Sequence, residues 1–257
     1  MPSLLRAPGV SARFLDLLAQ EPLDRSRILD VGCGAGRLSL VLAQAAKWVV
    51  GLDREAPLIQ EARRRAAAAH LANVEFHEAD VEADSYEPWR PDLVTAHLCA
   101  SDAIIERAAR ALAPGACLAM VSFHVDQWKE TGKVSRFAYS EARMRVTLES
   151  NGFTVEALEV ERDVRRFDSV EEGLAAAVGL EDRWKADGRW FRYIAFLESG
   201  GRTLTRSHLL VKARRGGAQP QASRADNRQG EAQPQASRAD NRQGEAQPQA
   251  SRADNKK

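Results

Sequence analysis

The stretch RILDVGCGAGRLSLVLA, residues 27–43, decides the fold of this chain. Its aliphatic start predicts a buried strand, and the apolar residues after Arg37 recur at helical spacing. Between the two lie Gly32, Gly34 and Gly36. Glycine lets the backbone turn tightly and lets a ligand lie close to main-chain N–H groups at the start of a helix. The stretch therefore predicts a strand, a ligand-binding loop and a helix.

Further along the chain, short apolar runs alternate with longer amphipathic stretches. Runs that predict strands lie at residues 47–52, 73–77, 92–97 and 116–124, and later at 153–162 and 202–214. Between them, apolar residues recur three and four positions apart, as on a helix with one buried face, and the last such helix closes at Asn151-Gly152. This alternation is typical of a parallel sheet with helices on both faces. We therefore predict an α/β fold with a doubly wound seven-strand sheet.

Two carboxylates indicate which ligand the glycine loop holds. Asp53 closes the second predicted strand, where a carboxylate can accept both hydroxyls of a ribose. Asp30 precedes the first glycine by two residues, where it would repel a pyrophosphate but attract the ammonium group of a methionine moiety. A dinucleotide motif would place its third glycine at Arg37. The loop thus favours an adenosyl sulfonium cofactor over a nicotinamide dinucleotide.

Five segments, in order, resemble motifs of the class I S-adenosylmethionine-dependent methyltransferases. They are ILDVGCGAGRLSLVLA, VVGLDRE, VEFHEADVEA, PDLVTAHLCAS and ALAPGACLAMVSFH, and LESNGFTVEALEVER is similar to the part that follows in that family. The resemblance implies a Rossmann-like methyltransferase fold, S-adenosyl-L-methionine as cofactor and methyl transfer as the activity.

The resemblance also implies which residues hold the cofactor. The implied contacts are Asp30, Gly32, Cys33, Gly34 and Gly36 for the amino-acid end, Asp53 with Arg54 for the ribose, Asp80 with Val81 for the adenine, and His97 for the methyl-donor end. Five of these residues have an alternative interpretation: Asp30 as a cap of the turn, Cys33 as a small packing residue, Arg54 as a surface side chain, Asp80 as part of a solvated acidic loop, and His97 as a hydrogen-bonded residue at the strand end.

No side chain is assigned a catalytic role. The sulfonium already carries an activated leaving group, so the protein mainly aligns the acceptor, and positioning supplies roughly 7–11 kcal/mol in well-oriented reactions. If the acceptor is a hydroxyl or an ammonium group, a base would help, and His97, His124 and Tyr139 are the candidates. His77 lies within a predicted strand and is expected to be structural.

The stretch between the last two predicted strands, residues 165–201, is longer than a hairpin requires. We predict a helical insertion there. It concentrates the aromatic residues Trp184, Trp190, Phe191, Tyr193 and Phe196. Two interpretations are open: a lid over the acceptor pocket, as insertions often serve in the family that the chain resembles, or a satellite core against the sheet edge. Trp128 and Tyr139 allow the same two interpretations.

Composition limits the partners of the chain. Lys and Arg total 37 against 36 Asp and Glu, so no net charge points to nucleic acid or to an anionic membrane. We therefore expect a small-molecule acceptor of unidentified structure in preference to a nucleic acid, with RNA as an open alternative. Two other classes stay open: a nicotinamide-dependent oxidoreductase, and a non-catalytic adenosyl-ligand-binding or regulatory module with the methyltransferase fold.

The cysteines and the apolar pattern predict a location. Cys33, Cys99 and Cys117 form no CxxC pair, so neither a disulfide framework nor a metal site is expected. The first residues lack the uninterrupted apolar stretch of a signal peptide, and no segment is long and apolar enough to span a membrane. These features predict a cytoplasmic protein.

The last part of the chain is repetitive. The sequence AQPQASRADNRQGE begins at Ala218, restarts at Ala232 and Ala246, and contains no aliphatic side chain larger than that of Ala. Such sequence buries too little apolar surface to offset the entropy of ordering. We predict a methyltransferase domain over residues 1–215 and a disordered repeat tail over residues 216–257.

Overall fold

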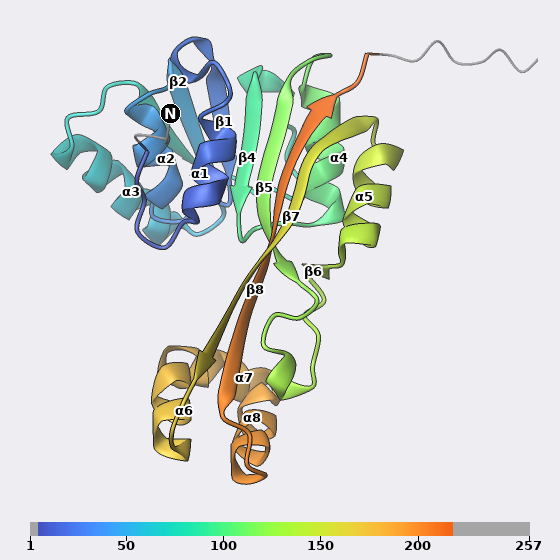
Figure 1. The fold of residues 1–257 in the computed structure, drawn as a ribbon. Helices are drawn as coiled ribbons and strands as arrows, with labels where there is room; N and C mark the ends of the chain where they lie inside the picture. Colours follow the sequence, from blue (N-terminus) through green and yellow to red (C-terminus); the bar gives the residue numbers. More distant parts are fainter. Residues whose placement is uncertain (1–4, 218–257) are drawn as a thin grey trace, which may run out of the picture. The chain divides into compact units, whose positions relative to one another are not determined.

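The computed structural model describes residues 5–217, whose strands form one sheet with the path β3-β2-β1-β4-β5-β8-β7 (Figure 1). The strands of this path are β1 (Arg27–Val31), β2 (Trp48–Asp53), β3 (Val74–Glu78), β4 (Leu93–His97), β5 (Cys117–His124), β7 (Phe153–Arg166) and β8 (Thr203–Arg215). Strands β1 to β5 run parallel, and β8 lies antiparallel between β5 and β7. The predicted seven-strand path is confirmed. The sheet also has an eighth strand, the two-residue β6 (Ala138–Tyr139), which pairs with the end of β5.

Helices cover both faces of the sheet because alternate residues of each buried strand point to opposite sides. The helices are α1 (Ala12–Leu18), α2 (Arg37–Ala43) and α3 (Ala56–Ala68) on one face, and α4 (Asp102–Ala111) and α5 (Glu141–Ser150) on the other. Ile28 and Val49 belong to the core beneath α1 and α2. Their neighbours Leu29 and Val50 belong to the core beneath α4 and α5. The predicted doubly wound arrangement is therefore confirmed.

Serine side chains fix where four of the helices begin. The hydroxyl oxygens of Ser11, Ser101, Ser140 and Ser169 each accept a hydrogen bond from the backbone N–H three residues further on. An N-cap of this kind stabilises a helix by about 1 kcal/mol because a first-turn N–H would otherwise lack a partner. At the end of α5, Gly152 has a φ of 76°, which a glycine adopts without strain.

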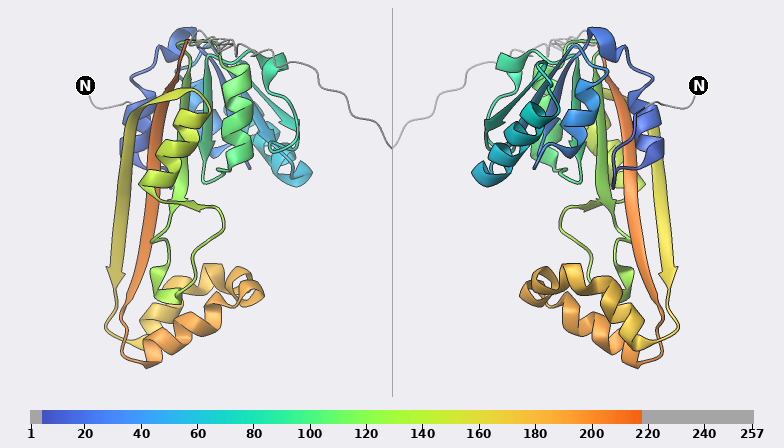
Figure 2. Two further views of the ribbon diagram at one scale, coloured as in Figure 1. Left: turned by 90° about the vertical axis from the view of Figure 1, so that its right-hand side faces the viewer. Right: turned by 90° about the vertical axis from the view of Figure 1, so that its left-hand side faces the viewer.

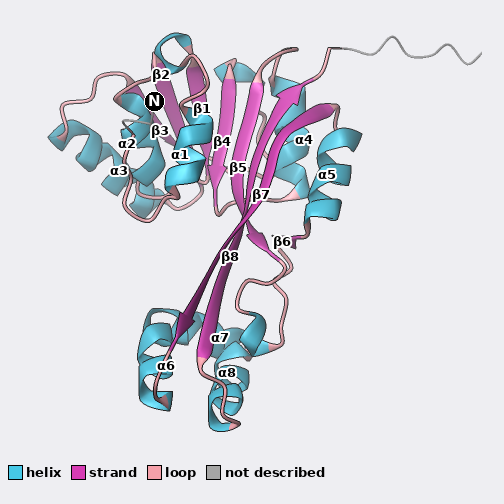
Figure 3. Ribbon diagram, viewed as in Figure 1, coloured by secondary structure: helices cyan, strands magenta, loops and turns pink. Residues whose placement is uncertain are grey.

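Strands β7 and β8 continue past their neighbours as a two-stranded hairpin that carries the insertion (Figure 2). The insertion comprises α6 (Val170–Ala177), α7 (Glu181–Asp187) and α8 (Arg189–Glu198), grouped at the end of the hairpin (Figure 3). Short 3-10 helices occupy Leu23–Arg25, Glu87–Trp89, Lys129–Thr131 and Val178–Leu180. The predicted helical insertion between the last two strands of the chain is confirmed.

The aromatic residues of the insertion form a separate hydrophobic core. Trp184 is fully buried, and its ring lies edge-on to those of Trp128 and Tyr193, with centroids 5.2 Å and 5.5 Å away. Phe191 is the exception, because its side chain faces solvent. Tyr139 packs in the main core instead. The satellite-core interpretation therefore holds for most of this cluster, which lies at the end of the hairpin and not along the sheet edge.

A buried ion network ties the segment after α1 to the two long strands. Both carboxylate oxygens of Glu21 accept hydrogen bonds from the Arg214 guanidinium at 2.7 Å, and the Lys212 ammonium lies 2.7 Å from Glu21 Oε1. The side chains of Glu21 and Lys212 are only 8% and 5% exposed. Burial alone would raise the pKa of Glu21, but the hydrogen bonds from Arg214 and Lys212 lower it. The Glu21 carboxylate thus compensates the positive charge of Lys212, whose side chain is buried.

Two further predictions concern membrane-spanning segments and the repeat tail. Among the described helices, none has the length and apolar content needed to cross a bilayer. The predicted tail over residues 216–257 lies outside the described residues except for its first two positions, so its disorder and the domain boundary at 215 stay predictions.

We predict that Glu21→Ala lowers the free energy of unfolding by about 3 kcal/mol, because it leaves the buried Lys212 charge with too few partners. The control is Glu149→Ala, which removes an exposed carboxylate paired with Arg145 on α5 and is expected to change stability by less than about 0.5 kcal/mol. Urea unfolding of both variants checks this. Equal losses in the two variants would contradict the assigned role of the network.

Candidate functional site

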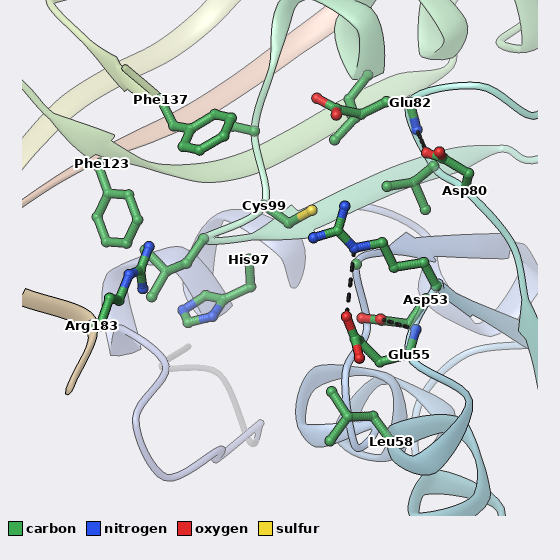
Figure 4. A pocket seen from close by; sticks show the side chains of 16 residues that line it. Asp53, Glu55, Leu58, Asp80, Glu82, His97, Cys99, Phe123, Phe137 and Arg183 are labelled. Atoms are coloured by element: carbon green, nitrogen blue, oxygen red, sulfur yellow. Dashed lines mark hydrogen bonds and ion pairs between the residues drawn. The ribbon is translucent and has the colours of Figure 1, made fainter. Parts of the chain in front are cut away.

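Two adjoining cavities lie where β1, β2 and β4 end, which is where open α/β sheets bind ligands. The larger has a volume of about 550 Å³ and the smaller about 270 Å³, and Gly32, His97 and Leu98 line both. The larger is also lined by Asp53, Arg54, Glu55, Leu58, Asp80, Val81, Glu82, Cys99, Ala100, Ile104, Phe123, Phe137 and Arg183 (Figure 4). The smaller is also lined by Val10, Asp30, Cys33, Gly34, Ala35, Arg37, Leu38 and Arg65. Every predicted cofactor contact except Gly36 therefore lines one cavity or the other.

The glycine loop forms the wall between β1 and α2. Gly32, Gly34 and Gly36 have φ values of 70°, 54° and 79°, a region that other residues enter only with strain. A Cβ atom on Gly32 would lie 2.3 Å from the Cys99 sulfur, so the close approach of the β4 end requires glycine there. Gly36 also has a positive φ; it is the N-cap residue of α2 and does not line either cavity.

The Asp53 carboxylate holds the glycine loop in place and faces the larger cavity. Its Oδ2 accepts a hydrogen bond from the Gly34 N–H at 2.8 Å, and its Oδ1 accepts one from the Glu55 N–H at 3.0 Å. Each oxygen of a carboxylate has a second lone pair, so Asp53 keeps two acceptor positions for a ligand. The same side chain thus shapes the loop and offers acceptors to the cavity.

Asp30 is a buried acid without a cationic partner. Its side chain is 1% exposed, and the Ser39 hydroxyl donates to Oδ2 at 2.5 Å. Burial raises the pKa of Asp30 to about 7, although the hydrogen bonds from Ser39 oppose this, and the nearby Asp53 charge adds to it. None of the ion pairs within residues 5–217 includes this carboxyl. It lines the smaller cavity, where a cationic ligand would compensate the charge.

The acidic loop after β3 lines the far side of the larger cavity. Asp80 is exposed, and its Oδ1 accepts from the Glu82 N–H at 2.9 Å, while Val81 is buried beside it. Arg54 is also exposed and lies 3.6 Å from a Glu55 oxygen. Asp80 and Arg54 are therefore solvated, as their alternative interpretation has it, and both also line the cavity. Cys33 is buried against α3, and its burial raises the thiol pKa.

His97 lies on the wall that the two cavities share. Burial, together with the neighbouring His208 and Arg37, lowers its pKa to about 4. The imidazole is therefore neutral at pH 7 and adds no charge to the junction. Next to it, Leu98 has a φ of 58°, a left-handed conformation that costs on the order of 1 kcal/mol and turns the chain across both cavities.

The two other candidate bases do not line either cavity. The buried His124 ring lies between Glu141 Oε2, at 3.1 Å from Nε2, and the Ser207 hydroxyl, at 3.0 Å from Nδ1. The Tyr139 hydroxyl donates to Asp102 at 2.6 Å. His124 is the last residue of β5 and Tyr139 lies in β6, and it is the adjacent Phe123 of β5 that lines the larger cavity. His77 packs against Trp89, also away from the cavities.

Sequence reasoning missed part of both walls. Arg37 and Arg65 bring two guanidinium groups to the smaller cavity, which already holds Asp30. Phe123, Phe137 and Arg183 line the larger one. The position of Arg37, directly after the glycine triplet, could have indicated from the sequence that its guanidinium lies at the cavity. Arg65 comes from α3, Phe123 from β5, Phe137 from the loop before β6 and Arg183 from the insertion. Only the tertiary fold brings these residues to the cavities.

Comparison with known proteins identifies the type of domain. Residues 23–170 match the family model described as a methyltransferase domain. The 23S rRNA (uracil(1939)-C(5))-methyltransferase RlmD of Shewanella sp. (strain MR-4) is 43% identical over 79 residues. That match spans 30% of this chain but only 17% of the relative's length.

Solved structures share the fold at low sequence identity. The YcgJ protein from Bacillus subtilis superposes with a TM-score of 0.63 at 14% identity, covering 80% of this chain and all of that one. Phosphoethanolamine N-methyltransferase 2 of Haemonchus contortus, solved with phosphomonomethylethanolamine and S-adenosylhomocysteine, gives a TM-score of 0.56 at 18% identity. The match covers 82% of this chain and 54% of that one.

We predict that Gly32→Ala lowers the free energy of unfolding by at least about 1 kcal/mol more than Gly34→Ala does. Both positions have positive φ, but only the Gly32 methyl group would overlap Cys99, whereas nothing lies within 4 Å at Gly34. Cys99→Gly in the Gly32→Ala background should restore part of the loss. Chemical unfolding of the three variants checks this, and equal losses at the two glycines would contradict it.

The Asp30 pKa gives a second prediction. Its folded value of about 7 lies above the ordinary value of 3.8, so the folded state loses stability as pH rises through this range. Asp30→Asn removes the buried charge and should raise the free energy of unfolding at pH 8 by roughly 2–4 kcal/mol. The gain should shrink steadily towards pH 5. A gain that does not vary with pH, or a loss at pH 8, would contradict the pKa assignment.

Proposed function

The chain belongs to the methyltransferase domain family, and we propose that it transfers a methyl group from S-adenosylmethionine to a small molecule. The family match confirms the resemblance to the class I S-adenosylmethionine-dependent methyltransferases and the cofactor that it implies. The observation that carries the proposal is the buried, unpaired Asp30 carboxyl beside the glycine loop. Such a group costs free energy unless a cation compensates it, and S-adenosylmethionine brings an ammonium group.

The residues of the two cavities fit this cofactor. We assign the ammonium group to Asp30 and the carboxylate of the methionine moiety to Arg37 and Arg65, in the smaller cavity. We assign the ribose hydroxyls to the free acceptor positions of Asp53. Asp80, with the Val81 backbone, is assigned to the adenine. The assignment places opposite charges of ligand and protein next to each other at both ends of the amino-acid moiety.

The chemistry requires little from the side chains. Bound S-adenosylmethionine supplies an activated methyl group, so the chain has to orient the acceptor and exclude water. We propose that His97 and Leu98 form the wall at which the acceptor meets the donor end, because both line the two cavities. With its pKa lowered to about 4, His97 is a weak base, and we assign it a positioning role.

A small-molecule acceptor agrees with the shape and the charge of the site. The larger cavity has a volume typical of small-ligand pockets, and Arg183 of the insertion forms one of its walls. Formal net charge is +1, without the excess of basic residues that binds a phosphate backbone. The second candidate is an RNA acceptor, which the match to RlmD favours. That match spans only a small part of the relative, so its substrate is a weaker guide than the cavity.

Two further proposals concern the class of protein and its location. The non-catalytic alternative, an adenosyl-ligand-binding module, would retain cofactor affinity but transfer no methyl group to any acceptor.

The thiols Cys33, Cys99 and Cys117 are free, which supports a reducing, cytoplasmic location.

The test is calorimetric titration of S-adenosylmethionine and S-adenosylhomocysteine into the protein at pH 8. We predict binding of both, no binding of NADH, and an affinity at least about tenfold lower in Asp53→Asn, which loses a charged acceptor for the ribose. The control is Asp92→Asn, whose carboxylate also accepts from a backbone N–H, that of Arg27 at 2.8 Å, but does not line either cavity. Binding of NADH alone, or equal affinity losses in the two variants, would refute the proposed cofactor site.

A further inference from the structure

The larger cavity has two chemically different ends. Figure 4 shows Asp53, Glu55, Asp80 and Glu82 at one end and His97, Phe123, Phe137 and Arg183 at the other. The proposed function assigns the acidic end to the nucleoside. The end with the two phenylalanines and the arginine is then available to the acceptor, and its chemistry describes what the acceptor is.

The two phenylalanines give this end flat, aromatic walls, and the Arg136 guanidinium carbon lies 4.5 Å from the centre of the Phe137 ring. Phe123 lies near the end of β5, and its ring is held by Trp128 and His208, whose ring centroids are 5.7 Å and 6.0 Å away. Phe137 is 38% exposed, a large fraction for a phenylalanine that lines a cavity. Aromatic rings stabilise other rings through stacked or edge-on contacts, so this end favours a ring-containing molecule.

Arg183 adds a positive charge without an internal partner. On the same helix, the Lys185 ammonium lies 2.6 Å from Glu181, and the neighbouring Arg189 pairs with Asp187. No ion pair or hydrogen bond within residues 5–217 involves the Arg183 guanidinium, which faces the cavity and is exposed. A guanidinium binds carboxylate and phosphate groups in two-point geometry.

We infer that the acceptor is a small molecule with an apolar ring and an anionic group, a carboxylate or a phosphate, that pairs with Arg183. This inference rests on the proposed function. The four carboxylates at the opposite end repel the anion and thus fix the orientation of the acceptor. Its ring lies between Phe123 and Phe137, and its other end reaches the wall formed by His97 and Leu98.

An RNA nucleotide also combines a ring with a phosphate, but the cavity favours a free small molecule. RNA binding needs several phosphate contacts to reach useful affinity. The acidic residues Glu55, Asp80 and Glu82 lie along the opposite wall and would repel a continuing backbone. Of the two arginines that line the cavity, Arg54 lies beside the Glu55 carboxylate, and Arg183 supplies a single contact.

The test measures fragment binding to protein saturated with S-adenosylhomocysteine. The probes are 4-hydroxybenzoate, its neutral analogue 4-hydroxybenzamide, the non-aromatic anion cyclohexanecarboxylate, and phenyl phosphate to compare the two anions. We predict that 4-hydroxybenzoate or phenyl phosphate binds about tenfold more tightly than the amide, as for a hydrogen-bonded charge pair. Cyclohexanecarboxylate should bind more weakly than the aromatic anion.

Matched variants assign the effect to one side chain. In Arg183→Gln the preference for the anion should fall to less than about threefold, whereas Arg192→Gln, an exposed arginine of α8 that does not line the cavity, should keep it. S-adenosylhomocysteine affinity should stay unchanged in both, which separates this inference from the proposed function. Absence of an anion preference, including no fragment binding at all, or its persistence in Arg183→Gln, would overturn the inference. A uracil-containing RNA oligonucleotide that binds more tightly than every fragment would also overturn it.

Discussion

The Asp30 carboxyl is the constraint on which the site depends. It lies at the end of β1, inside the protein, with the Ser39 hydroxyl as its side-chain donor and no ion-pair partner among residues 5–217. Burying a charge in this way is costly, and the raised pKa of about 7 expresses that cost. The buried Asp30 carboxyl lines a cavity that the sheet, the glycine loop and α2 enclose. The unfavourable charge becomes favourable once a cationic ligand occupies the cavity.

The fold separates two tasks along the chain. The first half builds the cavities that we assign to the cofactor from loops that follow parallel strands, and Asp53 links these loops by accepting from the Gly34 and Glu55 N–H groups. The second half extends β7 and β8 into a hairpin whose helices have their own aromatic core. That core also includes Leu204 of β8, and the insertion brings Arg183 to the wall of the larger cavity.

The part of the site that depends on local pattern is predictable from the sequence. A glycine loop between a strand and a helix, with carboxylates at two strand ends, indicates Asp30 and Asp53 as ligand contacts. Local pattern did not predict α1, whose apolar stripe is short, or the acceptor end. Phe137 and Arg183 carry no local signal, because Phe137 lies in the loop before β6 and Arg183 lies in the insertion, which the long hairpin carries. The candidate base His124 does not line either cavity, because local pattern gives its position along β5 but not the side to which its ring points.

One measurement tests the central claim, that the Asp30 charge forms when the methyl donor binds. Calorimetric titration of S-adenosylhomocysteine at pH 6, in two buffers with different ionisation enthalpies, gives the number of protons released on binding. Free Asp30 is mostly protonated at this pH, since its pKa is about 7, and the ligand ammonium favours the carboxylate. The account predicts release of close to one proton by the wild type and none by Asp30→Asn. Binding without proton release by the wild type, or equal release by both proteins, would contradict it.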